Sequence, residues 1–283
     1  MSKPHKYICA TQNCAKLPPA RRKQWLSSAS MSTGAVSSIA VPASRFHPGA
    51  KMMRSAVAAP ENAQIRWMEI AGPAVPTAYL HGLGAAAVPY FLDVALHRNM
   101  LLRRSLLIDL LGSGLSDRPQ RFPYTLSDHA RVIACALDTA GVREVNVVGH
   151  SLGGSVAIVL AYERPDLVGR LVVAEPNLLP WDGDASVNIA RQDENAFCDR
   201  GFDELVANAD PEWVATLRVT DPRALHRTAV GLCQGSDPVM HSMLCSLAIP
   251  RTLIYGSRST PPPEPDRLRS RNEINYLIGG VMV

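Results

Sequence analysis

Acidic residues are missing from the first part of this chain. Residues 1–54 contain nine Lys and Arg residues and no Asp or Glu, although the net charge of the whole 283-residue chain is only +4. The remainder therefore holds 20 basic against 25 acidic residues and is mildly acidic. Because nucleic-acid binding normally requires a basic surface, we expect no nucleic-acid partner.

Long hydrophobic runs are also absent. No segment approaches the roughly 18 apolar residues that a membrane-spanning helix needs, and the N-terminus lacks the apolar core of a secretory signal. The six cysteines show no Cys-x-x-Cys pair and no His/Cys spacing that could close a metal site. A Gly-x-Gly-x-x-Gly nucleotide loop is missing too. We therefore expect a cytoplasmic protein with reduced thiols, no membrane partner, no metal and no cofactor.

The acid-free segment differs from the rest in its pattern as well as its charge. Residues 1–54 are rich in Ser, Ala, Pro and Arg and show no hydrophobic period. Such a composition cannot bury enough apolar surface to order itself, so we expect a disordered extension over 1–54 and one domain over 55–283. An Arg-rich, acid-free segment is also typical of an organelle transit peptide. Two explanations of residues 1–54 therefore stay open. The segment is either an artefactual extension before a later translation start or a targeting segment.

From residue 63 onward, short apolar runs alternate with helical patterns, which is typical of βαβ units and a doubly wound, mostly parallel sheet. A helix is predicted to begin at Thr125, with Asp128 as an acidic partner in its first turn, and to end near Gly141. Residues 186–246 read as several amphipathic helices without a strand, which indicates a helical cap. The predicted strands are 64–71, 76–80, 105–110, 144–148, 170–175 and 251–255.

One short motif carries the chemistry of the chain. Gly149-His150-Ser151-Leu152-Gly153 lies between a predicted strand and an apolar helix. In this context the turn must be so tight that the serine is strained and the flanking glycines allow strand and helix to approach. The Ser151 hydroxyl would then be exposed at the carboxyl end of the sheet, beside the N–H groups that begin the helix. The motif therefore predicts a serine nucleophile.

Together with His81-Gly82-Leu83-Gly84 and the loop from Asp109 to Asp117, this motif resembles the α/β-hydrolase superfamily, in particular its esterase and haloperoxidase-like branch. The resemblance covers roughly residues 63–260. It implies Ser151 as the nucleophile and the backbone N–H groups of Leu83 and Leu152 as the oxyanion hole. It also implies that His81, Asp109 and Asp117 shape the loops around the site and do not transfer protons.

In the resembled family, the catalytic residues follow one another in the order Ser, acid, His. This chain departs from that pattern at the acid. Many relatives carry it three residues after the glycine that ends the late strand, and this chain has Ser259 there. The best substitute is Glu175, which ends the strand after the nucleophile helix, a position that some relatives use. Asp182, Asp184 and Asp266 are alternatives, although polar loop sequence around them favours an ordinary solvated carboxylate.

The histidine is a larger departure, because the family places it beyond a final strand and no His follows His241 here. Residues 273–283 are either the start of that strand or the product of a frameshift or premature stop. We expect the last strand and the closing helix to be missing. His226 and His241 of the cap could replace the base, but packing roles are the more ordinary expectation for both.

Two functions follow from these residues. The first is a serine hydrolase, resembling carboxylesterases, in which Ser151 attacks a small hydrophobic ester-like or related acyl substrate. The alternative is a catalytically impaired truncated product or a non-catalytic member that binds small molecules. A dehalogenase is disfavoured, because that chemistry places Asp where this chain has Ser151.

Overall fold

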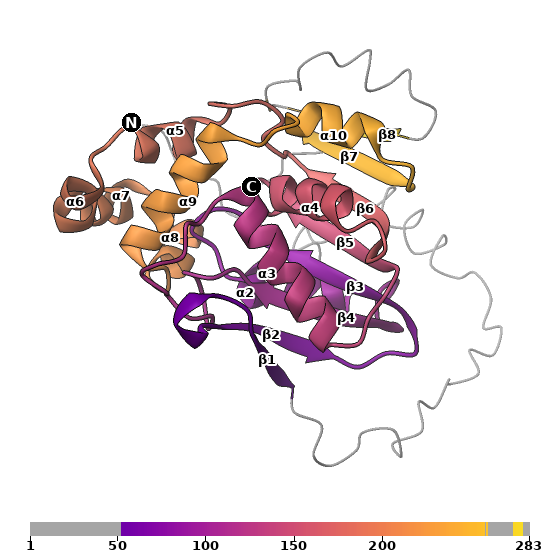
Figure 1. Ribbon diagram of the computed structural model, residues 1–283. Helices are drawn as coiled ribbons and strands as arrows, with labels where there is room; N and C mark the ends of the chain where they lie inside the picture. Colours follow the sequence, from indigo (N-terminus) through magenta and orange to yellow (C-terminus); the bar gives the residue numbers. More distant parts are fainter. Residues whose placement is uncertain (1–51, 258, 260–273, 280–283) are drawn as a thin grey trace, which may run out of the picture. The chain divides into compact units, whose positions relative to one another are not determined.

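The computed structural model describes residues 52–257, 259 and 274–279. Eight strands of these residues form one sheet in the order β1-β2-β4-β3-β5-β6-β7-β8 (Figure 1). β1 and β4 each pair antiparallel with β2, and the remaining neighbours are parallel. The predicted doubly wound, mostly parallel sheet is confirmed. The strands are β1 (Met53–Val57), β2 (Gln64–Ile70), β3 (Ala74–Leu80), β4 (Arg103–Asp109), β5 (Val145–His150), β6 (Val168–Ala174), β7 (Arg251–Gly256) and β8 (Ile274–Gly279).

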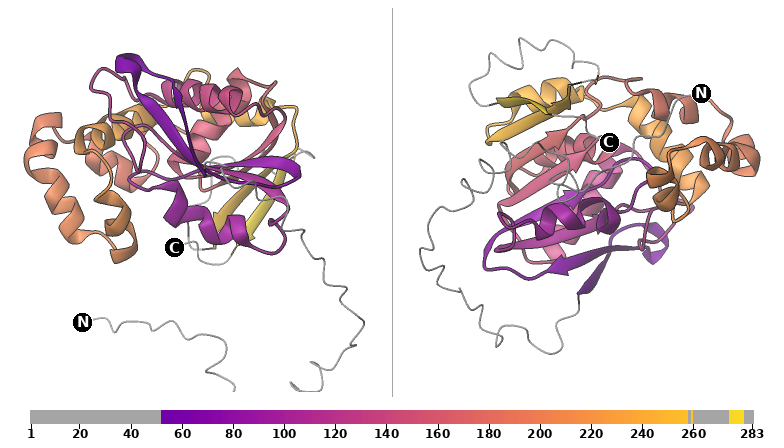
Figure 2. Two further views of the ribbon diagram at one scale, coloured as in Figure 1. Left: turned by 90° about the horizontal axis from the view of Figure 1, so that it is seen from below. Right: turned by 180° about the vertical axis from the view of Figure 1, so that it is seen from behind.

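Helices cover both faces of the sheet. α3 (Leu126–Thr139), α4 (Leu152–Glu163) and α10 (Met240–Ser246) lie on one face, and α2 (Ala87–Leu96) lies on the other (Figures 1 and 2). Between β6 and β7 the chain forms a separate helical cap. The cap consists of α5 (Asp184–Ala190), α6 (Glu194–Ala196), the π-helical turn η4 (Phe197–Gly201), α7 (Phe202–Asn208), α8 (Pro211–Leu217) and α9 (Pro222–Gln234). No helix in the described ranges is long and apolar enough to cross a membrane.

α4 is the central helix of the main core. All residues from Leu152 to Ala161 are buried, so the helix has no polar face. It packs against β5 and β6 on one side and against α3 and α10 on the other. A helix that is apolar all round must lie inside the protein, which explains why this segment lacks an amphipathic period. The residue that precedes α4 is therefore held against a rigid, buried element.

α3 shows the local signals that predicted it. The Thr125 hydroxyl accepts a hydrogen bond from the Asp128 backbone N–H at 3.2 Å, and Gly141 follows the helix with a φ of +66°. Ser, Thr and Asp side chains at the first position satisfy N–H groups that have no partner inside the helix, and a left-handed glycine ends a helix without strain. The predicted start and end of this helix are thus confirmed.

α2 was not predicted, because its cap comes from a distant part of the chain. Its first residue, Ala87, donates its backbone N–H to Asp109 Oδ1 at 2.7 Å. The preceding residue, Ala86, supplies no side-chain cap, and Pro89 occupies the first turn. The neighbouring residues therefore give no sign that a helix begins here, because its first backbone N–H is bonded by the Asp109 carboxylate at the end of β4.

The two edge strands correct the predicted limits of the domain. β1 begins at Met53, so Met53 and Arg54 belong to the sheet and not to the extension; residues 1–51 of that extension lie outside the described residues. β8 pairs in parallel with β7, with Ile254 opposite Leu277. The expectation that the last strand is missing is therefore wrong, because residues 274–279 provide it. The closing helix that we expected to be missing falls outside the described residues.

The cap is also shorter than its predicted range of 186–246. α10 lies within that range but packs against α4 in the main domain, where Met240, Met243 and Leu244 join the core of the sheet. The cap has its own small core, made by Ile189, Phe197, Leu217, Leu225 and Ala229. Sequence could not separate the two, because both groups of helices are amphipathic and only packing decides which apolar face each one covers.

Candidate active site

Ser151 sits on the strained turn that the motif predicted. It links the end of β5 to the start of α4 with φ +49° and ψ −121°, a backbone conformation that residues other than glycine rarely adopt. Its backbone N–H donates to Ala174 O at 2.9 Å, which ties the turn to the end of β6. Strain of this kind persists only where surrounding structure enforces it. Here β5, β6 and α4 together do so.

The two glycines of the motif are required by close backbone approach. A Cβ atom on Gly153 would lie 2.1 Å from Leu80 O, at the end of β3. A Cβ atom on Gly149 would lie 2.4 Å from Gly153 O. Neither position has room for any side chain, since the obstructing atoms belong to the backbone. The nucleophile turn is therefore pressed against the segment that follows β3.

The two residues assigned to the oxyanion hole lie on either side of this contact. Leu152 is the first residue of α4, where backbone N–H groups have no partner inside the helix. Leu83 lies in the loop after β3, next to Gly82, whose Cα faces the Ser151 side chain: a Cβ atom there would lie 3.7 Å from Ser151 Cβ. The helix dipole adds a partial positive charge at the same end of α4.

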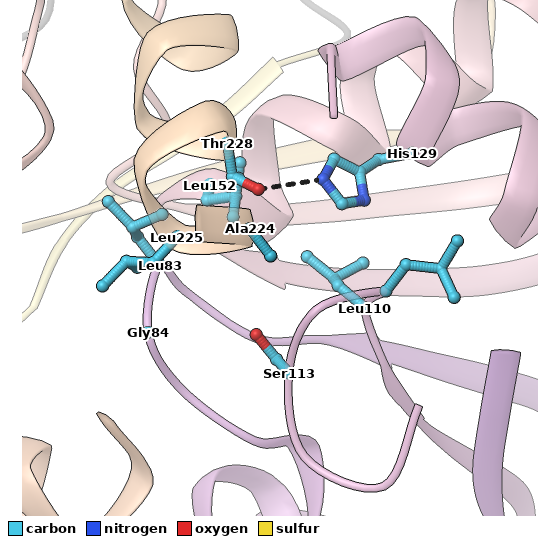
Figure 3. Close-up of a pocket in the computed structure, with 10 residues that line it drawn as sticks. Leu83, Gly84, Leu110, Ser113, His129, Leu152, Ala224, Leu225 and Thr228 are labelled. Atoms are coloured by element: carbon cyan, nitrogen blue, oxygen red, sulfur yellow. Dashed lines mark hydrogen bonds between the residues drawn. The ribbon is translucent and has the colours of Figure 1, made fainter. Parts of the chain in front are cut away.

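A small apolar pocket adjoins these two leucines (Figure 3). Its cavity volume is about 10 Å³, which is room for about one water molecule. The α9 residues Ala224, Leu225 and Thr228 form the wall on the cap side, so the pocket lies between the cap and the main domain. The remaining lining residues are Leu83, Gly84, Leu110, Leu111, Ser113, His129 and Leu152.

Glu175 stands next to the nucleophile turn, at the end of β6. Its Oε1 accepts hydrogen bonds from the Gly256 backbone N–H at 2.9 Å and from the Ser259 hydroxyl. Burial alone would raise the pKa of this carboxyl, but these two hydrogen bonds and the nearby His150 outweigh it and hold the pKa below its usual value. Glu175 is therefore ionised at neutral pH and reaches across to the end of β7, where Ser259 replaces the acid of many relatives.

His150 is the imidazole that contacts this carboxylate. Its Nε2 lies 3.7 Å from Glu175 Oε2, and its Nδ1 lies 2.7 Å from the Tyr90 hydroxyl of α2. An ionised carboxylate can only accept, so Nε2 carries the proton that faces Glu175, and Nδ1 accepts from the Tyr90 O–H. Burial, with the Glu175 charge, raises the pKa of Tyr90 to about 12. Burial also lowers the pKa of His150, against the influence of Glu175. A neutral His150 thus carries its proton on Nε2, facing Glu175.

His81 and Asp109 hold the loops, as the resemblance implied. His81 is 1% exposed; its Nε2 lies 3.0 Å from the Leu110 N–H and its Nδ1 lies 2.8 Å from Gly82 O. Its pKa is lowered by burial. Asp109 accepts from the backbone N–H groups of Ala87 and Leu115. Both side chains therefore fix the turns on either side of the oxyanion loop. Asp117 likewise fixes β2, since its Oδ2 accepts from the Gln64 N–H at 2.9 Å.

The two cap histidines that could replace the base make no hydrogen bond to Ser151 among the described residues. His226 packs against Phe197 in the cap core, and its Nε2 lies 2.8 Å from Gln192 O. His241 is the second residue of α10, and its backbone N–H donates to Leu178 O at 3.1 Å. Neither contacts Ser151 or Glu175, which agrees with packing roles. Of the alternative acids, Asp182 and Asp184 are exposed in and after the loop before α5, and Asp266 lies outside the described residues.

His129 lies at the wall of the pocket. It is 1% exposed on α3, and its Nε2 lies 3.3 Å from Thr228 Oγ1 of α9 (Figure 3). Burial, with a smaller contribution from His81, lowers its pKa to about 4, while Asp128 acts in the opposite direction. His129 is therefore neutral in the folded protein and links the main domain to the cap.

In the described part of the chain, no group of three or more His, Cys, Asp or Glu side chains could hold a metal ion.

The buried His129 predicts a loss of stability in mild acid. The unfolded chain binds a proton on this residue below about pH 6.5, whereas the folded protein does so only near pH 4. Its contribution is complete above pH 6.5 and is lost as the pH falls toward 4, by about 1 kcal/mol at pH 5.5. Urea unfolding at pH 7.5 and 5.5 measures this. His129→Gln should show the smaller decrease, and equal decreases in both proteins would contradict the prediction. Comparing the two proteins cancels the contribution of His81, which has the same sign.

Comparisons with known proteins agree with this geometry. Residues 79–261, more than half of the chain, match the family described as the alpha/beta hydrolase fold. The sequence is 33% identical over 102 residues to 2-hydroxymuconate semialdehyde hydrolase from Pseudomonas putida, covering 36% of each chain. It is 47% identical over 68 residues to Lipase LipV from Mycobacterium tuberculosis, covering 24% of this chain and 25% of that protein.

A solved structure extends the likeness to most of the chain. The structure of a thermophilic esterase from Thermogutta terrifontis, with malate bound, matches with a TM-score of 0.65 and 18% identity, and the match covers 81% of this chain and 90% of that one. At this identity the match shows the fold alone. By sequence, the chain spans about a third of the length of the first curated relatives it matches. The sheet order, the strained Ser151 turn and the family match together show that this chain belongs to the α/β hydrolase fold family.

Proposed function

We propose that this protein is a serine hydrolase that attacks ester or related acyl substrates through Ser151. The observation that carries the proposal is the backbone of Ser151, held at φ +49° between a strand and the N-terminus of a buried helix. A strained turn of this kind exposes the hydroxyl beside unpaired N–H groups. Since one fold hosts many activities, the argument depends on this site and not on the fold.

In the proposed reaction, the Ser151 oxygen bonds to the carbonyl carbon of the substrate while its proton passes to water. The negative charge that develops on the carbonyl oxygen is stabilised by the backbone N–H groups of Leu83 and Leu152 and by the dipole of α4. The tetrahedral intermediate then collapses: the C–O bond to the alcohol part of the ester breaks, and the leaving alkoxide takes up a proton from water. A second water molecule hydrolyses the acyl-enzyme, which releases the acid and restores Ser151. The apolar residues beside these N–H groups favour a small hydrophobic substrate, and no step uses a cofactor.

Glu175 supplies the acid of the proposed site. Its Oε1 is occupied by Gly256 N–H and Ser259, so the carboxylate is held in one orientation. Its Oε2 is the oxygen that faces an imidazole, 3.7 Å from His150 Nε2. A carboxylate in this position selects the tautomer of the imidazole that it contacts and stabilises positive charge on that ring. Glu175 is thus a positioning residue that acts through His150.

Covalent labelling of Ser151 tests this proposal. The folded protein is incubated with a small fluorophosphonate, which phosphonylates activated serines, and the modified peptide is identified by mass spectrometry. We expect modification of Ser151, and none after heat denaturation, because only the folded turn holds the hydroxyl beside the N–H groups of Leu83 and Leu152, which stabilise the charge that develops on the phosphonyl oxygen. A folded protein in which Ser151 stays unmodified would refute the proposal.

A second candidate function is binding of small hydrophobic molecules without turnover. It is favoured by the observation that both ring nitrogens of His150 already have partners, Tyr90 and Glu175. In the described part of the chain, none of the histidines contacts Ser151, so the proton of its hydroxyl has no imidazole to accept it. This candidate predicts that short-chain p-nitrophenyl esters bind to the protein, as detected by calorimetry, without release of p-nitrophenol.

A further inference from the structure

The cap touches the oxyanion loop at one specific hydrogen bond. Trp213, a half-buried residue of α8, donates its ring N–H to the backbone carbonyl of Leu83 at 3.0 Å. The two residues are 130 positions apart in the sequence. The indole ring has one hydrogen-bond donor and no acceptor, so the orientation of the Trp213 ring determines where the bonded carbonyl oxygen lies. The bond therefore joins a cap helix to the residue whose own N–H we assign to the oxyanion hole.

The bonded carbonyl belongs to the central peptide of a tight turn. Ala85 donates its N–H to Gly82 O at 3.3 Å, so the turn runs from Gly82 to Ala85. Gly84 has a φ of +65°, whereas Leu83 keeps a negative φ. Positive φ at the third residue alone is typical of a type II turn. Types I and II differ by a rotation of the peptide between the two central residues, here the Leu83–Gly84 peptide, and Trp213 holds its carbonyl in one of the two orientations.

Packing around the same turn strengthens this contact. A Cβ atom on Gly84 would lie 2.6 Å from Leu217 Cδ2 and 2.9 Å from Trp213 Nε1, so α8 rests directly on the turn. The Leu83 side chain packs against both the main core and the cap core. The oxyanion loop is thus held between two hydrophobic clusters, and Trp213 provides the polar contact between them.

We propose that Trp213 is a positioning residue that holds the oxyanion loop in the orientation needed to stabilise the transition state. The inference rests on the proposed serine hydrolase function. Trp213 touches neither the substrate nor the reacting atoms in this proposal. It acts through the Leu83 carbonyl, which belongs to the Leu83–Gly84 peptide, and so holds the turn as a whole. The Leu83 N–H belongs to the preceding Gly82–Leu83 peptide and is positioned through this turn. Oxyanion stabilisation depends on donors that are already in place before charge develops. The cap therefore contributes to the chemical step as well as covering the site.

The variant Trp213→Phe tests this proposal, since it keeps an aromatic ring on α8 and removes the ring N–H. Hydrolysis of p-nitrophenyl acetate is measured beside Trp181→Phe, a matched change at a tryptophan that is 56% exposed. We expect kcat to fall about tenfold in Trp213→Phe with little change in KM, because the interaction serves the transition state and not the bound substrate. Trp181→Phe should match the wild type.

A second readout separates positioning from a general effect on folding. A trifluoromethyl ketone forms a tetrahedral adduct with the nucleophile, so its inhibition constant reports the oxyanion hole. We expect this constant to rise about tenfold in Trp213→Phe, in parallel with the loss of kcat. If Trp213→Phe does not fold, benzothienylalanine at position 213 keeps the shape of tryptophan and has sulfur in place of the ring N–H.

The outcomes distinguish this proposal from the one on which it rests. An unchanged kcat and inhibition constant in a folded variant without the N–H would overturn the role of Trp213 and leave the serine hydrolase intact. A fall in melting temperature with unchanged kcat would likewise assign Trp213 to stability alone. If the wild type and Ser151→Ala are equally inactive, the serine hydrolase itself fails, and the role of Trp213 fails with it.

Discussion

Replacing Ser151 with alanine is expected to lower kcat/KM for p-nitrophenyl acetate by at least about 10³-fold. The hydroxyl is the group that bonds to the substrate, so alanine removes the acyl-enzyme route altogether. What remains is the stabilisation of the oxyanion by the Leu83 and Leu152 N–H groups, which acts only on direct attack by water. Steady-state kinetics with the wild type and the variant measures the ratio. Ser242→Ala is the control, because Ser242 is exposed on α10.

The same position should reveal the strain of the turn. Ser151 and its alanine variant both have a side chain at a φ of +49°, whereas glycine adopts this conformation freely. Ser151→Gly is therefore expected to be inactive and more stable than Ser151→Ala by about 1 kcal/mol in urea unfolding. Equal kcat/KM values for the wild type and Ser151→Ala would show that the nucleophile lies elsewhere or that the protein binds without turnover.

Replacing Glu175 with glutamine is expected to lower kcat/KM by about 10³-fold while the protein stays folded. Glutamine has the same shape, and its carbonyl oxygen can still accept from the Gly256 N–H. It lacks the negative charge that selects the His150 tautomer and stabilises positive charge on that ring, so the loss should appear in kcat. The measurement is hydrolysis of p-nitrophenyl acetate from pH 5 to 9, with urea unfolding to confirm stability.

A matched control exists for this change. Asp182 is an exposed carboxylate in the loop after β6 and was an alternative acid by sequence. Asp182→Asn should keep the activity of the wild type. If Glu175→Gln keeps its activity and Asp182→Asn or Asp184→Asn loses it, the acid has been assigned to the wrong residue. If both changes are silent in an active enzyme, the base is not oriented by any of these carboxylates.

Local signals were sufficient for much of the fold. The predicted strands and the main helices appear within a few residues of their expected limits, because periodic apolar residues and turn glycines are written in neighbouring positions. The Gly149 to Gly153 motif also predicted a strained turn, and Ser151 has that conformation. These features depend on contacts between residues close in sequence or on strands whose apolar pattern is unambiguous.

Other elements depend on partners that sequence spacing does not show. α2 begins where it does because Asp109 caps it from the end of β4. β8 was doubted because the family resemblance places a histidine beyond the final strand and no histidine follows His241; pairing with β7 makes residues 274–279 a strand. An edge strand gains its hydrogen bonds from a neighbour, so its existence is a property of the sheet and not of the segment.

The sequence by itself determined the order of most elements and the strained turn at Ser151, and it indicated Glu175, directly after β6, as the candidate acid. Only the tertiary structure decided what surrounds them: His150 beside Glu175, Tyr90 on its other nitrogen, and Trp213 on the Leu83 carbonyl. The physical reason is that a strained turn is encoded by adjacent residues, whereas hydrogen bonds between side chains far apart in sequence form only after the sheet and the cap have packed together.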